Sequence, residues 1–340
     1  MTMAKMRSAK ITSKGPHLGD PIPAEGENGL FSQSWFPICR SYDIRPGEVK
    51  GFDFLDGRVI VFRGENGVAS VKSAYCPHVG ADLSVGKVVG NNIRCAFHHW
   101  DYDQSGKCVK TGIGDPPPPT ACLFNFPTLE RFGVIWAFNG EEPLFELPSF
   151  RHPDNELEIG VIAGDTYNCD GWVFACNTPD MQHLKVVHKI MPHHADPHKD
   201  VEWDPWGFHY NVAAAHGQGP EIGWRLAIRG TSIFHQQGMI DDWWFGVIAG
   251  FSCPRPGKHQ IFLACATHRG SGSVADVALA KERLERGMII IRRTADEDRD
   301  ILNTIHYRPG TLTKGDTTLA KYLDFLRGYP RAHPSARFIV

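Results

Sequence analysis

The stretch "YCPHVGADLSVGKVVGNNIRCAFHHWDY", residues 75–102, contains two cysteines and three histidines within twenty-eight positions. Cys76 and His78 form a C-x-H pair, and Cys95 and His98 form a C-x-x-H pair, with sixteen residues between the two pairs. Each pair therefore offers one thiolate and one imidazole to a metal. Two such pairs so close together indicate a metal centre held between two loops.

Zinc and an iron–sulfur cluster are the two candidates for this centre. Zinc fingers also use two cysteines and two histidines, but they place the cysteines in one pair and the histidines in the other. In a Rieske [2Fe–2S] centre, one iron is held by two thiolates and the other by two imidazoles, so each loop supplies one ligand of each kind. Pro77 and Gly80 shape the first loop, and Trp100 can shield the second. The sequence therefore predicts a Rieske cluster held by Cys76, His78, Cys95 and His98.

Composition argues against several other classes of protein. Thirty-six basic and thirty-eight acidic side chains leave this chain of 340 residues near neutral, which disfavours nucleic acid or an anionic membrane surface as the main partner. No apolar run reaches the length of a transmembrane helix, and the basic amino terminus lacks the apolar segment of a secretory signal. Nine cysteines in such a chain favour metal ligation in a reducing compartment over disulfides. We therefore expect a cytoplasmic protein.

The order of apolar runs and turn residues predicts an α+β fold. Residues 1–33, rich in Gly, Pro and charge, are expected to form an N-terminal arm. Residues 34–145 consist of short apolar runs broken by Gly, Asp and Asn, which predicts an all-β domain around the cluster. Residues 146–340 follow a proline-punctuated boundary and are expected to form a second domain with an antiparallel sheet and helices.

In the second domain, aromatic and β-branched runs alternate with helical patterns. The strand candidates are "WRLAIRGTSIFHQ" (224–236), "DDWWFGVIAGFS" (241–252) and "HQIFLACATH" (259–268). The helix candidates are a segment near 172–190 and a longer one over residues 277–306, which no proline interrupts. Strands followed by a long helix are typical of an α+β domain.

With these features the chain resembles the Rieske non-heme iron oxygenases, in the large (α) subunit that carries the active site. The resemblance runs from "SWFPICRSYDIRPGEV" (34–49), through the two loops and "ERFGVIWAFNG" (130–140), to the C-terminal helix. Two positions depart from the family pattern. Val79 stands where the family usually has a small or basic residue, and His99 stands where it usually has glycine. Neither is a ligand, so the departures concern the hydrogen bonding and reduction potential of the cluster.

The resemblance implies a second metal site, a mononuclear iron in the second domain. The segment "NTPDMQHLKVVH" (177–188) matches the family motif D-x-x-H-x4-H with Asp180, His183 and His188. Two histidines and one carboxylate on one face of an iron leave positions open for dioxygen and substrate. Histidines five residues apart point about 140° away from each other on an ideal helix, so we expect a distortion such as a π-bulge.

The third iron ligand is expected far along the sequence, in "TADEDRDIL" (294–302). The family places its carboxylate in an acidic pair that is followed by two residues and an apolar one. Asp298 fits that register, with Asp296 and Glu297 as the alternatives. A plain solvated helix face would explain the same acidic residues without a metal.

Asp180 has a separate predicted role as a catalytic residue. Three positions along a helix displace it by only about 60° from His183, so its carboxylate can accept a hydrogen bond from that ring. The resemblance adds that the same carboxylate reaches a cluster histidine of the neighbouring subunit, which by motif position is His98. Asp180 would then join the two metal sites. The alternative is a helix cap, a position at which Asp is favoured.

The resemblance also implies the reaction and the partners. The chain would be the terminal oxygenase component that inserts one or both atoms of dioxygen into its substrate. Electrons would come from NAD(P)H through a separate reductase, with or without a ferredoxin, since the chain lacks a flavin- or nicotinamide-binding glycine fingerprint. A homotrimer is implied, in which the cluster of one subunit lies near the iron of the next.

The substrate is predicted from the composition of the second domain. Its abundance of Trp and Phe favours hydroxylation of a hydrophobic ring, aromatic or steroid-like, with oxidative O- or N-demethylation as the alternative. The predicted pocket residues are Asn177, Val187, Ile233 and Phe251. Two other classes remain as rivals: a Rieske electron carrier without oxygenase activity, which would lack the mononuclear iron, and a zinc-stabilised interaction module, which would be colourless.

Overall fold

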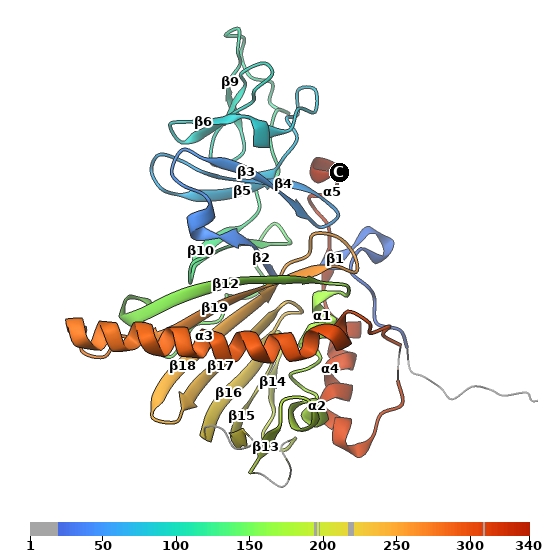
Figure 1. The fold of residues 1–340 in the computed structure, drawn as a ribbon. Helices are drawn as coiled ribbons and strands as arrows, with labels where there is room; N and C mark the ends of the chain where they lie inside the picture. Colours follow the sequence, from blue (N-terminus) through green and yellow to red (C-terminus); the bar gives the residue numbers. More distant parts are fainter. Residues whose placement is uncertain (1–19, 194–195, 197, 217–220, 309) are drawn as a thin grey trace, which may run out of the picture.

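The computed structural model describes residues 20–193, 196, 198–216, 221–308 and 310–340. An all-β domain occupies one end of the molecule, and a larger domain with one broad sheet occupies the other (Figure 1). The predicted α+β fold is confirmed. In the part of the chain so described, no helix is long and apolar enough to cross a membrane.

The N-terminal domain contains three antiparallel sheets around two small cores. The first joins β2 (Trp35–Arg40), β10 (Thr128–Arg131) and β11 (Val134–Phe138); the second joins β3 (Val49–Phe54), β4 (Gly57–Arg63) and β5 (Ala69–Ser73). The third joins β6 (Lys87–Val89), β7 (Asn92–Arg94), β8 (Asp101–Tyr102) and β9 (Cys108–Lys110). Strand β4 is apolar on both faces, because Val59 and Val61 enter one core while Ile60 and Phe62 enter the core that also holds Cys76 and Cys95.

The larger domain is built on an eight-stranded antiparallel sheet. Its strand order is β12-β19-β18-β17-β16-β15-β13, and β14 pairs with β15 as well. The strands are β12 (Leu157–Tyr167), β13 (Ile190–Pro192), β14 (Glu202–Asp204), β15 (Gly207–His216), β16 (Glu221–Arg229), β17 (Ile233–Ile240), β18 (Trp243–Phe251) and β19 (His259–His268). The face of this sheet toward the helices forms the main core of the molecule.

The helices are α1 (Gly171–Ala175), α2 (Met181–Val186), α3 (Val274–Leu302), α4 (Thr317–Arg327) and α5 (Ala336–Ile339). The long helix α3 crosses the face of the sheet (Figure 1). It begins at the cap Ser273, whose hydroxyl accepts the backbone N–H of Asp276. Gly287 lets it approach closely, because a Cβ atom there would lie 2.2 Å from the ring of Phe245. Short 3-10 turns occur at Glu27–Gly29, Ser41–Asp43, Leu83–Val85, Asp154–Glu156 and Lys314–Asp316.

Two predicted elements differ from the observed ones. The single strand expected over 224–236 is two strands, β16 and β17, because the chain turns between them at Gly230, whose φ is +60°. In place of the single helix expected near 172–190, the structure has two short helices, α1 and α2. The second of them, α2, ends at Val186. The hydrophobic pattern of such a run does not show where a hairpin turn divides it into two strands, which explains the first difference.

The segments near the two ends of the described chain lie side by side, and the C-terminus packs on the N-terminal domain. Strand β1 (Phe31–Ser32) pairs with β20 (Arg331–Ala332), close to the C-terminus. Ile339 of α5 is fully buried in a core of the N-terminal domain, where Gly57 leaves it room. Of the expected arm, residues 1–19 lie outside the described residues. In the remainder, Ile22 is buried in the core of the larger domain, whereas residues 27–30 are exposed.

Candidate active site

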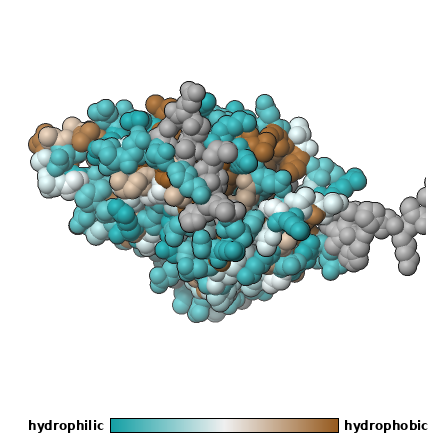
Figure 2. All heavy atoms as spheres, turned by 90° about the horizontal axis from the view of Figure 1, so that it is seen from below, coloured by the Kyte–Doolittle hydropathy of each residue, from teal (hydrophilic) through white to brown (hydrophobic). Residues whose placement is uncertain are grey.

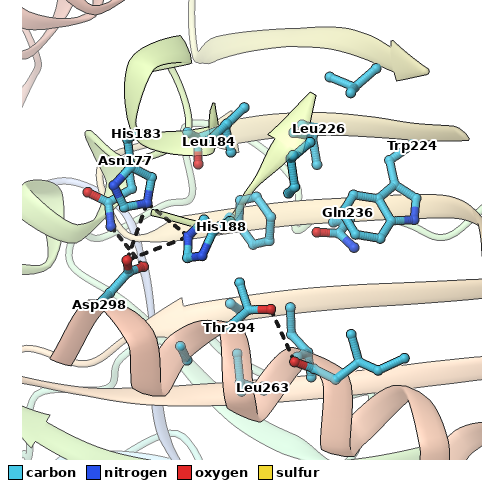
Figure 3. Close-up of a pocket in the computed structure, with 18 of the residues that line it drawn as sticks. Asn177, His183, Leu184, His188, Trp224, Leu226, Gln236, Leu263, Thr294 and Asp298 are labelled. Atoms are coloured by element: carbon cyan, nitrogen blue, oxygen red, sulfur yellow. Dashed lines mark hydrogen bonds and ion pairs between the residues drawn. The ribbon is translucent and has the colours of Figure 1, made fainter. Parts of the chain in front are cut away.

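Three side chains from two distant segments of the chain meet at one point at the edge of the large sheet. Nε2 of His183 lies 2.9 Å from Nε2 of His188, and Oδ1 of Asp298 lies 3.3 Å and 3.5 Å from these two nitrogens (Figure 3). The structure thus brings Asp298, and neither Asp296 nor Glu297, between the two histidines. Three converging donors of this kind suit a divalent iron with open positions.

The burial of Asp298 supports a cation at this point. The residue is only 3% exposed, and its Oδ1 atom has no hydrogen-bond donor among the described residues. A buried carboxylate oxygen without a partner is costly, and a metal ion between the three donors would remove that cost. The residues present therefore fit a mononuclear iron.

The two histidines converge because helix α2 is short. His183 lies on α2, whereas His188 lies beyond its end at Val186, and the next residue, Lys189, has a φ of +58°. The expected π-bulge is therefore wrong. Termination of the helix, rather than its distortion, turns the ring of His188 toward His183.

Neighbouring groups orient the ligands. Nδ1 of His188 lies 2.9 Å from Oε2 of Glu297, and the amide of Asn177 donates to Oδ2 of Asp298 at 3.0 Å. Burial lowers the pKa of His183 below its ordinary value, which keeps that ring neutral and able to bind a metal. Burial acts the same way on His188, but the carboxylates of Asp298 and Glu297 outweigh it and raise the pKa of His188.

Asp180 stands at the start of α2. Its Oδ1 atom accepts the backbone N–H of His183 at 2.9 Å, so the capping contact is present. No residue that the structure describes donates a hydrogen bond to its second oxygen, Oδ2, which can therefore accept another donor. The bridge from Asp180 to a cluster histidine of a second subunit remains a prediction.

The two loops of the N-terminal domain place cysteines inside and histidines outside. Cys76 and Cys95 are buried, and burial raises the pKa of Cys76, whose sulfur lies 3.0 Å from the hydroxyl of Tyr102. His78 and His98 are exposed, with ring centroids 4.7 Å apart. This division suits a two-iron cluster with a buried thiolate side and an exposed imidazole side.

Two further observations concern these loops. Trp100, expected to shield the second loop, stacks on His78 of the first loop, with the ring planes 9° apart. His99 has a φ of +54°, a left-handed conformation that glycine adopts more readily, which explains the glycine that the family pattern has there. Across the described ranges, three metal-binding atoms lie within 4.8 Å of one another at two places. Neither of these places is in the two cysteine and histidine loops. A single zinc ion would need such a gathering.

The second such triplet is His152, Glu156 and His268, and it does not suit a metal. The backbone N–H of Gly270 donates to Nδ1 of His268, so the neutral ring carries its proton on Nε2, which lies 3.2 Å from Glu156. His152 Nε2 already accepts from Arg151 at 3.0 Å. The group is therefore a hydrogen-bonded surface network.

An apolar pocket extends from the three converging ligands between the sheet and α3. Its wall includes Val212, Leu226, Phe234, Phe245, Leu263 and Ile290. Figure 3 shows His183, His188 and Asp298 at one end and Trp224 and Gln236 at the other. A pocket with this lining suits an apolar small molecule.

Of the predicted pocket residues, Asn177 lines this pocket and the other three do not. Ile233 faces the opposite side of β17 from Phe234 and is buried between the two domains. Phe251 is on the correct face of β18, but Gly171 and Phe174 cover it. Val187 lies between His183 and His188 in the sequence, but it does not line the pocket. Side chains alternate between the two faces of a strand, so the residues that face the pocket depend on the register of the strand. The amino-acid sequence alone did not reveal this register.

The structure does not bring the two metal-binding groups together within one chain. Strands β6 and β9, beside the cysteine and histidine loops, lie at the far tip of the N-terminal domain, whereas α2 lies at the opposite end of the molecule (Figure 1). The underside of the larger domain is mostly hydrophilic, with hydrophobic side chains in a few separate groups (Figure 2).

Comparison with known proteins identifies the N-terminal domain and finds relatives that match half of the chain. The family model of the Rieske [2Fe–2S] domain matches residues 34–127. The chain is 31% identical to cholesterol 7-desaturase nvd of Bombyx mori, over 50% of this chain and 37% of the relative. It is 28% identical to a 3-ketosteroid-9-alpha-monooxygenase oxygenase component of Rhodococcus rhodochrous, over 50% of this chain and 46% of the relative. The chain thus spans less than half the length of these relatives.

The fold has a match among solved structures. The structure of NdmA from Pseudomonas putida CBB5 with caffeine superposes with a TM-score of 0.67 at 19% identity, covering 86% of this chain and 89% of that one. The match covers both domains and therefore supports the arrangement of the whole chain.

Proposed function

We propose that the chain belongs to the Rieske oxygenases, with a [2Fe–2S] cluster and a mononuclear iron as cofactors. Within this family, the proposed role is that of the terminal oxygenase of a multicomponent monooxygenase. Its substrate is a hydrophobic ring compound. The observation that carries this proposal is the apolar pocket that opens directly on His183, His188 and Asp298. An electron carrier would not need such a pocket.

Each metal has a proposed set of ligands. Cys76, His78, Cys95 and His98 hold the cluster, and His183, His188 and Asp298 hold the iron. When bound, the cluster supplies single electrons and the iron activates dioxygen.

The protein's own residues prepare the site for this chemistry. Glu297 fixes the ring of His188, and Asn177 fixes the carboxylate of Asp298, so the three donors keep one geometry. The apolar wall would exclude water and hold the substrate beside His183, His188 and Asp298.

Ring hydroxylation is proposed ahead of oxidative demethylation. The curated relatives are named for a sterol and a 3-ketosteroid, which supports a rigid, polycyclic and largely apolar substrate. The phrase "oxygenase component" in a relative's name supports a separate reductase as the electron donor. The nine cysteines, all free, support a reducing compartment such as the cytoplasm.

The test is reconstitution with a surrogate reductase and a panel of aromatic and steroid-like compounds. We expect oxygen uptake coupled to a hydroxylated product. Formaldehyde release would identify a demethylase instead. An electron carrier would show only the two cluster irons per chain and no substrate-dependent oxygen uptake, which would contradict the proposal.

We also propose that the active form is a homotrimer with head-to-tail contacts. The cluster loops expose apolar side chains, among them Phe97 at 64%, and the region of the iron ligands exposes Val186 and Ile301. A heterologous contact between these two surfaces closes into a ring and brings the exposed His78 and His98 of one subunit toward α2 of the next.

Light scattering of the native protein tests this assembly. Phe97→Asp should dissociate the trimer and slow turnover without changing the absorption of the cluster, whereas Tyr42→Asp, at another exposed aromatic of the same domain, should do neither. A monomer that turns over at the full rate would rule the trimer out.

A further inference from the structure

One polar side chain stands out in the wall of the apolar pocket. Gln236 of β17 is only 4% exposed and faces the pocket. Its register partners on the flanking strands are Leu226 of β16 and Val247 of β18, both apolar. In Figure 3, Gln236 lies beside Trp224 at the end of the pocket remote from His183 and Asp298.

The amide of Gln236 makes no hydrogen bond to any residue that the structure describes. Beside it, the indole N–H of Trp224 is fully buried and has no partner among the described residues. By contrast, the hydroxyl of Thr294 in the same wall donates to the carbonyl of Ile290 at 3.1 Å. Gln236 is thus a polar residue only 4% exposed, whose amide faces an apolar pocket without a hydrogen bond, and such a group is unfavourable unless a ligand completes it.

We propose that Gln236 is a specificity-determining residue that binds one neutral oxygen at the end of the substrate remote from the metal. The wall contains no Lys or Arg among its described residues, so a carboxylate or phosphate would be buried without a counter-charge there. A ketone or hydroxyl oxygen accepts the amide N–H at no such cost. This inference deepens the proposed function, since it specifies the substrate class: an apolar ring system with a single terminal oxygen.

The position of Gln236 also fixes the direction in which the substrate lies. With its oxygen on Gln236, a rigid ring system extends along the apolar wall toward His183 and His188. The carbon presented to the metal is then the one farthest from the oxygen. Gln236 thus selects the site of oxidation as well as the substrate.

Binding without turnover tests the inference separately from the oxygenase activity. The probes are two matched pairs that differ by one oxygen, trans-2-decalone with trans-decalin and 5α-androstan-3-one with 5α-androstane. Their dissociation constants are measured on the oxidised holoenzyme without reductase. For at least one pair we expect the ketone to bind about tenfold more tightly than the hydrocarbon, the size of effect that one completed buried hydrogen bond gives.

Gln236→Leu should abolish this preference, and Gln236→Met, closer in shape, should do the same if the leucine variant folds poorly. The matched control is Gln237→Leu, because Gln237 is the next residue on the opposite face of β17 and its amide oxygen accepts the backbone N–H of Arg151. The control should keep the preference. An equal preference in wild type and both Gln236 variants, or no preference in wild type for either pair, overturns the inference. Failure of the oxygenase assay alone would not.

Discussion

Oε2 of Glu297 lies 2.9 Å from Nδ1 of His188, on the side of the ring opposite the Nε2 atom that faces Asp298. Two consecutive acidic residues of α3 therefore hold the same imidazole from its two edges. Glu297 accepts a hydrogen bond from the ring of His188. Asp298 lies beside the other ring nitrogen, at the proposed iron site. Carboxylates in such an outer position fix the tautomer and orientation of a metal-binding histidine.

Glu297→Ala should weaken iron binding about 10–100-fold, because the ring of His188 loses its orienting partner. Titration of the iron-depleted protein with Fe(II) measures this, and the absorption of the cluster should not change. Glu297→Gln, which keeps an acceptor oxygen, should restore part of the affinity. The control is Asp296→Ala, whose carboxylate instead pairs with Arg299 on the helix surface. Equal loss in both alanine variants would contradict the assignment.

His183→Ala should remove the mononuclear iron and abolish turnover, while the visible and paramagnetic signals of the cluster persist. The two sites lie at opposite ends of the molecule and share no ligand (Figure 1). Metal analysis and spectroscopy of the same preparation check this. His152→Ala, in the surface network, should keep full iron content. Disappearance of the cluster signals in His183→Ala would show that the two sites are not separate.

The sequence predicted the metal-binding groups because their information is local. Each loop pair and the motif around His183 lies within a few residues, and Asp298 was selected by its register within one acidic run. The meeting of Asp298 with two histidines more than a hundred residues earlier then needed only one long helix in the expected place. Glu297 was considered only as a ligand, and its hydrogen bond to His188 was visible only in the structure.

The pocket and the chain ends could not be predicted in the same way. Whether Ile233 or Phe234 faces the pocket depends on the turn at Gly230, and a shift of one residue exchanges the two faces of the strand. The return of Ile339 to the N-terminal domain depends on a contact between chain ends, which no local pattern encodes.

Ile339→Ala should lower the free energy of unfolding of the N-terminal domain by about 2–4 kcal/mol, because the side chain is fully buried and leaves a cavity. Urea denaturation followed by the absorption of the cluster measures the change. Val340→Ala, at the adjacent residue that is 81% exposed, should have almost no effect. Similar stabilities of the two variants would mean that α5 does not support this domain.

His259 should make the larger domain sensitive to acid. Burial lowers the pKa of His259 to about 4, below the ordinary value of 6.5 that applies in the unfolded chain. Between these values the unfolded state binds more protons. The contribution of neutral His259 to the free energy of unfolding is therefore fully present above pH 6.5. It is lost as the pH drops toward 4, by about 2 kcal/mol between pH 7 and pH 5.

His259→Phe should remove this part of the pH dependence. Phenylalanine keeps the stacking on Tyr167, where the rings are now 4° from parallel, but it cannot bind a proton. Loss of the hydrogen bond to the carbonyl of Cys169 lowers stability equally at both pH values. Urea denaturation at pH 7 and pH 5 isolates the difference, with exposed His306→Phe as the control. An unchanged pH dependence in His259→Phe would refute the prediction.

Asp180→Asn separates the helix cap from the proposed bridge between subunits. The amide oxygen of asparagine can still accept the backbone N–H of His183, so α2 and both metals should be retained. The negative charge is lost, and with it a strong acceptor for an imidazole N–H of the neighbouring subunit. We expect that the reduced cluster of this variant fails to re-oxidise when substrate and oxygen are mixed in a single turnover, as followed by its visible absorption. Asp180→Ala, which also loses the cap, should in addition be less stable by about 1 kcal/mol. Near-normal re-oxidation in Asp180→Asn would leave Asp180 as a helix cap alone.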